Sequence, residues 1–104
     1  MTAERIKLND AKDLIEQGAN VADIRDQLSY QAGHIKGAKH IDNQSVQGFI
    51  DAIDKNDPLI VNCYHGNASI SASQFFAEQG FTKVFSLDGG FEMFKLQYPE
   101  LCQS

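Results

Sequence analysis

The feature that most constrains the fold is an uncharged segment in the second half of the chain. Residues 58–77 contain no Asp, Glu, Lys or Arg, although 22% of the 104 residues are charged. The segment opens with Pro58 and the run Leu59-Ile60-Val61, which is typical of a short buried strand. Gly66 interrupts this pattern, and apolar side chains then recur at helical spacing up to Gly80, a residue type that commonly ends helices. The segment therefore predicts a buried strand joined by a short loop to a helix.

The same alternation of strand and helix runs through the rest of the chain. Expected strands lie at 6–8, 21–24, 39–41, 59–61 and 84–87, and expected helices at 9–17 (capped by Asn9 or Asp10), 46–53, 68–79 and 91–96. Residues 25–37 show no clear period and are expected to be irregular. Such alternation predicts an α/β fold, with a parallel sheet covered by helices on both faces. The length predicts a single domain spanning residues 1–104.

Composition excludes several classes of function. The net charge of −5 argues against a general nucleic-acid binder, which gains affinity from a basic face. No apolar run approaches the ~18 residues of a membrane span, and residues 1–5 do not resemble a secretion signal. Two cysteines are too few for a disulfide framework. We therefore expect a cytoplasmic protein that binds neither nucleic acid nor membrane, and the sequence does not indicate an oligomeric state.

The loop after the central strand carries the candidate chemistry. Cys63 follows the strand directly and precedes the expected start of a helix, where backbone N–H groups lack partners and carry partial positive charge. Gly66 permits the unusual backbone angles that a loop curling around Cys63 demands. N–H groups directed inward would lower the thiol pKa and would bind an anion without a cationic side chain. The candidate nucleophile is Cys63, and the candidate substrate-binding loop comprises Tyr64, His65, Gly66, Asn67, Ala68 and Ser69.

Several of these side chains also have plainer interpretations. Tyr64 is expected to shape the pocket. Ser69 is expected mainly to cap the helix, with donation of its hydroxyl to a bound anion as the alternative. His65 is equally compatible with orienting an anion and with facing solvent. Cys102 is expected to be a bystander thiol near the end of the chain, with resolution of a Cys63 persulfide as the alternative.

A metal site is the weakest of the open alternatives. Cys63, His65, His34 and His40 have suitable ligand types, but their spacing lacks the paired ligands of zinc motifs. We therefore expect no metal at this site.

Three motifs together resemble rhodanese domains. They are residues 21–38, containing Val21-Ala22-Asp23-Ile24-Arg25-Asp26 and Gly33-His34-Ile35-Lys36-Gly37-Ala38; the loop from Cys63 to Ala68; and residues 84–94, containing Leu87-Asp88-Gly89-Gly90-Phe91-Glu92. The loop is especially similar to that of small single-domain thiosulfate sulfurtransferases. The resemblance implies a five-stranded parallel sheet and a buried Asp23–Arg25 pair. It also implies sulfur transfer from thiosulfate, through a Cys63 persulfide, to cyanide or a thiol, without a metal or organic cofactor.

One departure from the family pattern bears on substrate affinity. Many rhodanese loops end in Arg, whereas this loop ends in Ala68, so weak binding of thiosulfate is expected. Phosphatases and arsenate reductases on this fold use Cys-x5-Arg, but Ser69 stands at that position and no Arg follows Arg25. The remaining alternative is a non-catalytic persulfide carrier, a sulfur-relay module that receives sulfur from a partner protein.

Overall fold

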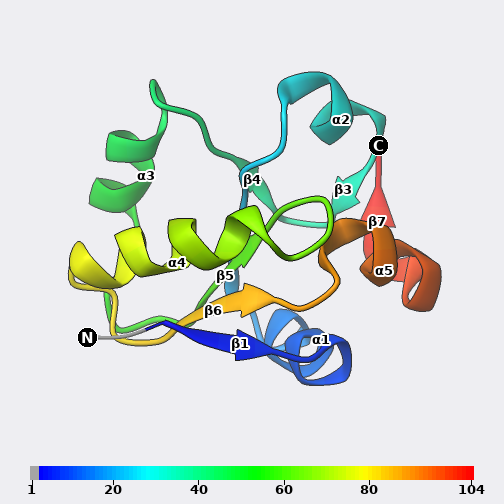
Figure 1. The fold of residues 1–104 in the computed structure, drawn as a ribbon, viewed down its shortest axis with the longest axis horizontal. Helices are drawn as coiled ribbons and strands as arrows, with labels where there is room; N and C mark the ends of the chain where they lie inside the picture. Colours follow the sequence, from blue (N-terminus) through cyan, green and yellow to red (C-terminus); the bar gives the residue numbers. More distant parts are fainter. Residues whose placement is uncertain (1–2) are drawn as a thin grey trace.

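A five-stranded parallel sheet forms the centre of the structure, a computed structural model that describes residues 3–104. The strand order is β1-β6-β5-β2-β4, and Figure 1 labels β1, β6, β5 and β4 of this sheet. Central strand β5 is buried at every residue, as its uncharged sequence predicts. The strands are β1 (Glu4–Ile6), β2 (Asn20–Asp23), β4 (Lys39–His40), β5 (Leu59–Asn62) and β6 (Val84–Leu87).

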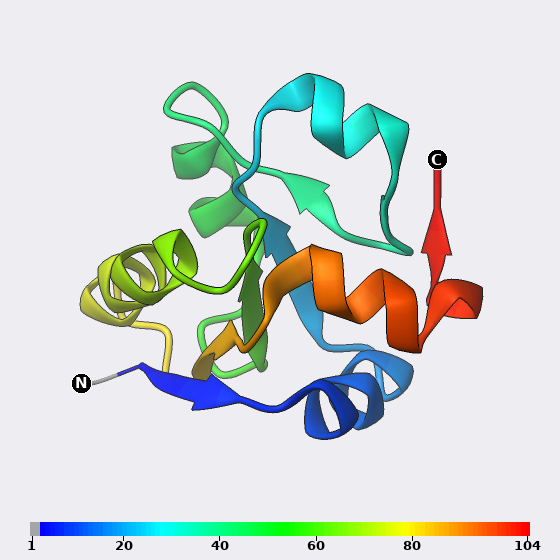
Figure 2. The same ribbon diagram turned by 45° about the vertical axis from the view of Figure 1, so that its right-hand side comes forward.

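Helices cover both faces of this sheet, which confirms the predicted α/β architecture. Helices α1 (Leu8–Glu16) and α5 (Gly90–Gln97) lie on one face, and α3 (Val46–Ala52) and α4 (Ala68–Glu78) on the other (Figure 2). Successive strand side chains point to opposite faces, so Ile60 packs in the cluster beneath α1 and α5 while Val61 packs beneath α3 and α4. Two separate hydrophobic clusters therefore hold the two layers of helices on the sheet.

The first strand and helix begin earlier than expected. The strand expected at 6–8 is wrong: β1 ends at Ile6, where it pairs with Leu87 of β6. Helix α1 begins at Leu8, which packs into the cluster beneath α1 and α5, and Lys7 rather than Asn9 or Asp10 is the N-cap residue. Ile6 and Leu8 therefore belong to two elements, the end of β1 and the start of α1. Their side chains pack in the same hydrophobic cluster. The predicted stop at Gly18 is confirmed, with φ 98°.

The stretch 25–37, expected to be irregular, contains regular elements. Helix α2 (Gln27–Ala32) is capped by Asp26, whose carboxylate accepts the Ser29 N–H at 2.8 Å. Strand β3 (His34–Ile35) pairs antiparallel with β7 (Cys102–Gln103), which follows the 3-10 turn η1 (Pro99–Leu101). No residue of α2 is buried, so its sequence has no apolar period, and the β3–β7 pairing joins segments far apart in the chain.

The topology places a crevice between β5 and β2. These strands are neighbours, but the chain leaves β2 toward β4 and leaves β5 toward β6, on the opposite side. Connections that diverge in this way open a space beyond the carboxyl ends of the strands, where α/β proteins bind ligands. Cys63 directly follows β5 at this point. No helix within residues 3–104 is long and apolar enough to cross a membrane.

Candidate active site

The Cys63 sulfur lies at the bottom of a cradle formed by the loop between β5 and α4. Cys63 is only 3% exposed, and its sulfur accepts the N–H of Gly66 at 3.2 Å and that of Ser69 at 3.3 Å. Gly66 has φ 90°, and a Cβ at this position would lie 2.8 Å from the backbone N of Gly89. A residue with a side chain therefore fits here neither conformationally nor sterically, and the glycine keeps the N–H groups aimed at the sulfur.

The Ser69 hydroxyl is hydrogen-bonded to the Cys63 sulfur, although the sequence interpretation assigned Ser69 mainly to helix capping. The Ser69 Oγ lies 3.3 Å from the Cys63 sulfur and 2.7 Å from the Ser86 Oγ of β6. The N-cap position of α4 belongs to Asn67, so the capping assignment of Ser69 is wrong. Ser69 is the second residue of α4 and is fully buried, because its side chain faces the sheet.

These donors determine the acidity of the thiol. Burial by itself would raise the pKa of Cys63. Hydrogen bonds from the Ser69 hydroxyl and from the backbone of Ser69, Gly66 and His65 outweigh it, so the pKa lies below its ordinary value. The start of α4 adds the partial positive charge of a helix N-terminus. The predicted lowering of the thiol pKa is therefore confirmed in direction.

The start of α5 supports the loop from the other side. The Phe91 N–H donates to the Cys63 carbonyl at 2.8 Å, and the Glu92 N–H donates to the Tyr64 carbonyl at 3.1 Å. Gly90, with φ 61°, allows this approach, since a Cβ there would lie 2.6 Å from the Cys63 carbonyl oxygen. The local sequence pattern did not predict this contact between α5 and the loop. The Gly-Gly pair after a buried strand was the available signal of a close backbone contact.

Tyr64 ties the loop to helix α2. Its hydroxyl donates to the Asp26 carboxylate and lies 3.1 Å from the Ser29 Oγ. The Tyr64 bond, followed by the bonds from Ser29, lowers the pKa of Asp26 to about 2. Tyr64 thus fixes the wall of the site, in keeping with the pocket-shaping role expected from the sequence.

The expected buried pair of Asp23 and Arg25 is confirmed. Asp23 is fully buried and Arg25 is 5% exposed, with Nη2 2.8 Å from the carboxylate. The same nitrogen donates to the Gly33 carbonyl at 2.6 Å, and the guanidinium lies 4.2 Å from the centre of the Phe91 ring. The Arg25 guanidinium is therefore engaged by Asp23, Gly33 and Phe91.

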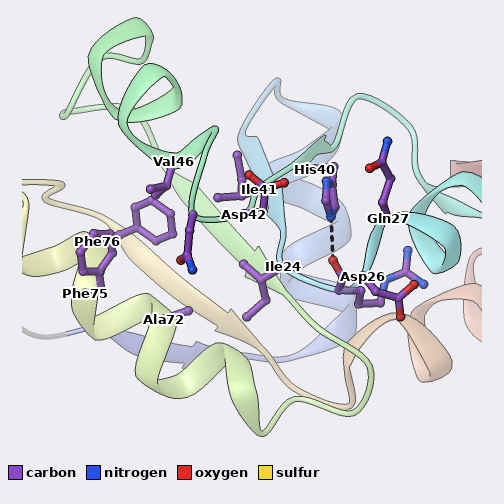
Figure 3. A pocket seen from close by; sticks show the side chains of 12 residues that line it. Ile24, Asp26, Gln27, His40, Ile41, Asp42, Val46, Ala72, Phe75 and Phe76 are labelled. Atoms are coloured by element: carbon purple, nitrogen blue, oxygen red, sulfur yellow. Dashed lines mark hydrogen bonds between the residues drawn. The ribbon is translucent and has the colours of Figure 1, made fainter.

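An open pocket of about 580 Å³ lies between the ends of β2 and β4 and helices α3 and α4. Figure 3 shows Ile24, Ala72 and Phe75 around its apolar part, with Asp26 and Asp42 among the polar residues. The His40 Nε2 lies 2.7 Å from the Arg25 carbonyl oxygen, shown by the dashed line in Figure 3. Asp26 lines this pocket and also accepts the hydroxyl of Tyr64, which belongs to the Cys63 loop.

The other candidate residues are spread around the loop. His65, Asn67 and Ala68 of the loop are exposed. His34 is buried and stacks on Tyr30, with ring centres 4.0 Å apart. Among residues 3–104, no three His, Cys, Asp or Glu side chains gather in an arrangement that could hold a metal ion.

Cys102 lies in a strand rather than in a loose tail. It is a partly buried free thiol in β7, and its sulfur lies 3.6 Å from the Tyr98 carbonyl oxygen. Burial, followed by the charge of Glu100, raises its pKa. The two thiols of the chain are therefore shifted in opposite directions.

Comparison with known proteins gives consistent matches along most of the chain. The family model of the Rhodanese-like domain matches residues 7–97. The thiosulfate sulfurtransferase GlpE of Pseudomonas paraeruginosa is 55% identical over 98 residues, which cover 94% of this chain and 89% of the relative. The protein of the same name from Pseudomonas fluorescens is 54% identical over 96 residues, covering 92% of this chain and 88% of the relative.

Solved structures agree on the fold. The reduced CoADR-RHD of Bacillus anthracis superposes with a TM-score of 0.82 at 22% identity, covering 98% of this chain and 18% of that one. The BH2092 protein of Bacillus halodurans has a TM-score of 0.78 at 26% identity, covering 91% of this chain and 73% of that one. The sheet order, the cysteine loop and the sequence matches thus lead to one conclusion: the chain belongs to the rhodanese-like domain family.

Proposed function

We propose that this protein is a thiosulfate sulfurtransferase, with residues 1–104 acting as a single rhodanese domain in the cytoplasm. The observation that carries the proposal is the cradle of N–H donors around the Cys63 sulfur. The name shared by relatives that are 55% and 54% identical supports thiosulfate as the sulfur donor. In this proposal Cys63 is the nucleophile and residues 64–69 form the donor-binding loop.

The first half-reaction loads the enzyme with sulfur. The Cys63 thiolate attacks the outer sulfur of thiosulfate, a bond forms between the two sulfur atoms, and the S–S bond of thiosulfate breaks. Sulfite leaves with the bonding electron pair, and the negative charge of the thiolate moves to the outer sulfur of the persulfide. Backbone N–H groups of the loop stabilise this charge, as preorganised donors do in an oxyanion hole.

The second half-reaction returns the enzyme to its starting state. Cyanide or a thiolate attacks the outer sulfur of the persulfide, and Cys63 leaves as a thiolate. A lower thiol pKa makes Cys63 a better leaving group, so the same hydrogen bonds assist both steps. Neither step requires a metal or an organic cofactor.

A persulfide carrier is the second candidate, because it needs the same nucleophile and the same cradle. Production of thiocyanate from thiosulfate and cyanide by the wild-type protein and by Cys63→Ser separates the two. The proposal predicts turnover by the wild type and none by Cys63→Ser. A wild-type protein that gains one sulfur from a cysteine desulfurase but makes no thiocyanate would be a carrier.

The loop sequence also predicts how firmly thiosulfate binds. The sixth loop position is Ala68, which is exposed, so no side-chain cation of the loop faces the dianion. We expect Ala68→Arg to lower the KM for thiosulfate about three- to tenfold, since a guanidinium can donate two charge-assisted hydrogen bonds. The test is to measure the KM for thiosulfate of Ala68→Arg and of Ala68→Gln by steady-state kinetics. Ala68→Gln is the control because it adds length without charge. Equal KM values for Arg and Gln would contradict the expectation.

A further inference from the structure

A pair of buried hydroxyl groups lies beneath the Cys63 sulfur and extends to strand β6. The Ser69 Oγ lies between the Cys63 sulfur, at 3.3 Å, and the Ser86 Oγ, at 2.7 Å. Ser69 is fully buried and Ser86 is 2% exposed, so both hydroxyls depend on protein groups for their hydrogen bonds. We propose that Ser86 is a positioning residue, whose hydroxyl orients that of Ser69 so that Ser69 donates to the Cys63 thiolate.

The direction of the two bonds follows from counting protons. A hydroxyl has one proton to donate, and a thiolate can only accept. Ser69 can therefore donate to the thiolate only if it does not donate to Ser86. The Ser69–Ser86 contact is then made by the Ser86 proton, which gives a chain running from Ser86 through Ser69 to the sulfur. Each bond in such a chain polarises the next.

The protonated thiol donates in the opposite direction in this structure, from the Cys63 Sγ to the Ser69 Oγ. Ser69 would then donate to Ser86, and the Ser86 proton would need another acceptor. Within residues 3–104, Ser69 is the sole side-chain partner of the Ser86 hydroxyl. Ionisation of Cys63 thus satisfies all the protons of the pair, whereas the reversed chain leaves one buried donor without a partner, which costs free energy. The pair should therefore favour the thiolate.

The experiment measures the pH dependence of Cys63 alkylation by iodoacetamide, in a Cys102→Ala background that leaves one thiol. We expect Ser86→Ala to move the midpoint upward by about half a pH unit, which slows alkylation about threefold below the midpoint. Ser73→Ala is the matched control, because Ser73 is another fully buried serine of α4. Its hydroxyl has no hydrogen-bond partner within residues 3–104. This control should retain the original midpoint.

Two further comparisons separate positioning from a general effect on packing. The side chains of Thr and Val have nearly the same shape, but only Thr has a hydroxyl. We therefore expect Ser86→Thr to retain the pH midpoint of alkylation and Ser86→Val to shift it. In a Ser69→Ala background, Ser86→Ala should add no further shift. Equal midpoints for Thr and Val, or an undiminished shift without Ser69, would overturn the proposal. The inference rests on the proposed role of Cys63. Alkylation needs no thiosulfate, so an effect of Ser86 on the Cys63 midpoint can be measured whether or not the protein transfers sulfur.

Discussion

At the scale of single residues, the reactivity of the site depends on which groups surround each sulfur. Cys63 accepts the backbone N–H groups of Gly66 and Ser69 and lies against the Ser69 hydroxyl, whereas Cys102 lies near a backbone carbonyl and Glu100. Hydrogen-bond donors stabilise a thiolate, while burial and negative charge destabilise it. The same residue type therefore has opposite pKa shifts at two positions of one small protein.

This difference predicts the order in which the two thiols react. Because the pKa of Cys63 is lowered and that of Cys102 is raised, Cys63 keeps its thiolate at pH values where Cys102 is protonated. Limited iodoacetamide at neutral pH should modify mainly Cys63, and the preference should shrink as the pH rises through the pKa of Cys102. Peptide mass spectrometry of samples quenched at several pH values measures this. Preferential modification of Cys102 at neutral pH would contradict the assigned shifts.

The sequence allowed the cradle to be predicted, but not the contact between the Ser69 and Ser86 hydroxyls. The donors Gly66 and Ser69 lie within six residues of Cys63, so their approach follows from one local turn before a helix. Ser86 lies 17 positions from Ser69, in strand β6, and its contact exists only once β6 has joined the sheet. Helix capping was therefore the better local interpretation of Ser69, although the tertiary structure gives it another role.

At the scale of elements, the loop is held between the start of α4 and the start of α5. Gly90 makes the second contact possible, because a Cβ would lie 2.6 Å from backbone atoms of Cys63 and Tyr64. Backbone atoms cannot move aside as the end of a flexible side chain can. The approach of α5 to the loop therefore requires glycine at this position.

Alanine at Gly90 should lower both stability and activity. We expect Gly90→Ala to reduce the free energy of unfolding by about 2 kcal/mol or more, from overlap and from its positive φ. Gly48→Ala is the matched control, because a Cβ there meets nothing within 4 Å and helix α3 favours alanine. This control should stabilise the protein by about 0.5–1 kcal/mol. Urea unfolding of both variants measures the difference, and equal effects would refute the close-contact argument.

The limits of sequence interpretation are also clearest at this scale. Strand β5 and helix α4 were predictable because their apolar residues are local and periodic. Helix α2 has no buried residue, and strands β3 and β7 are two residues long and pair across most of the chain. Their formation depends on tertiary contacts and on the Asp26 cap, so no period in the sequence indicates them.

At the scale of the whole molecule, net charge and site chemistry are separate properties. The chain carries a net charge of −5, yet residues 58–77, which contain the cradle, have no charged side chain. The buried Asp23–Arg25 pair lies beside the cradle and connects the end of β2 to Gly33 and Phe91. Its contribution is to hold several elements in place around the loop.

Loss of this pair should affect the stability of the whole protein. Arg25→Ala leaves the Asp23 carboxylate buried without its partner, which should cost about 3–5 kcal/mol. Arg5→Ala is the control, because Arg5 pairs with Asp88 while its side chain is 68% exposed, and exposed pairs contribute at most about 1 kcal/mol. Denaturant unfolding of both variants tests the contrast. A loss for Arg25→Ala no larger than that for Arg5→Ala would show that the pair is dispensable.

The central claim is that sulfur is carried on Cys63. The most direct measurement is the mass of the protein after exposure to thiosulfate without an acceptor, with the modified residue located by peptide mass spectrometry. We predict a gain equal to one sulfur atom on the Cys63 peptide, removed by cyanide with release of thiocyanate, and no gain in Cys63→Ser. Sulfur found on Cys102 instead, or full turnover by Cys63→Ser, would contradict the proposed mechanism.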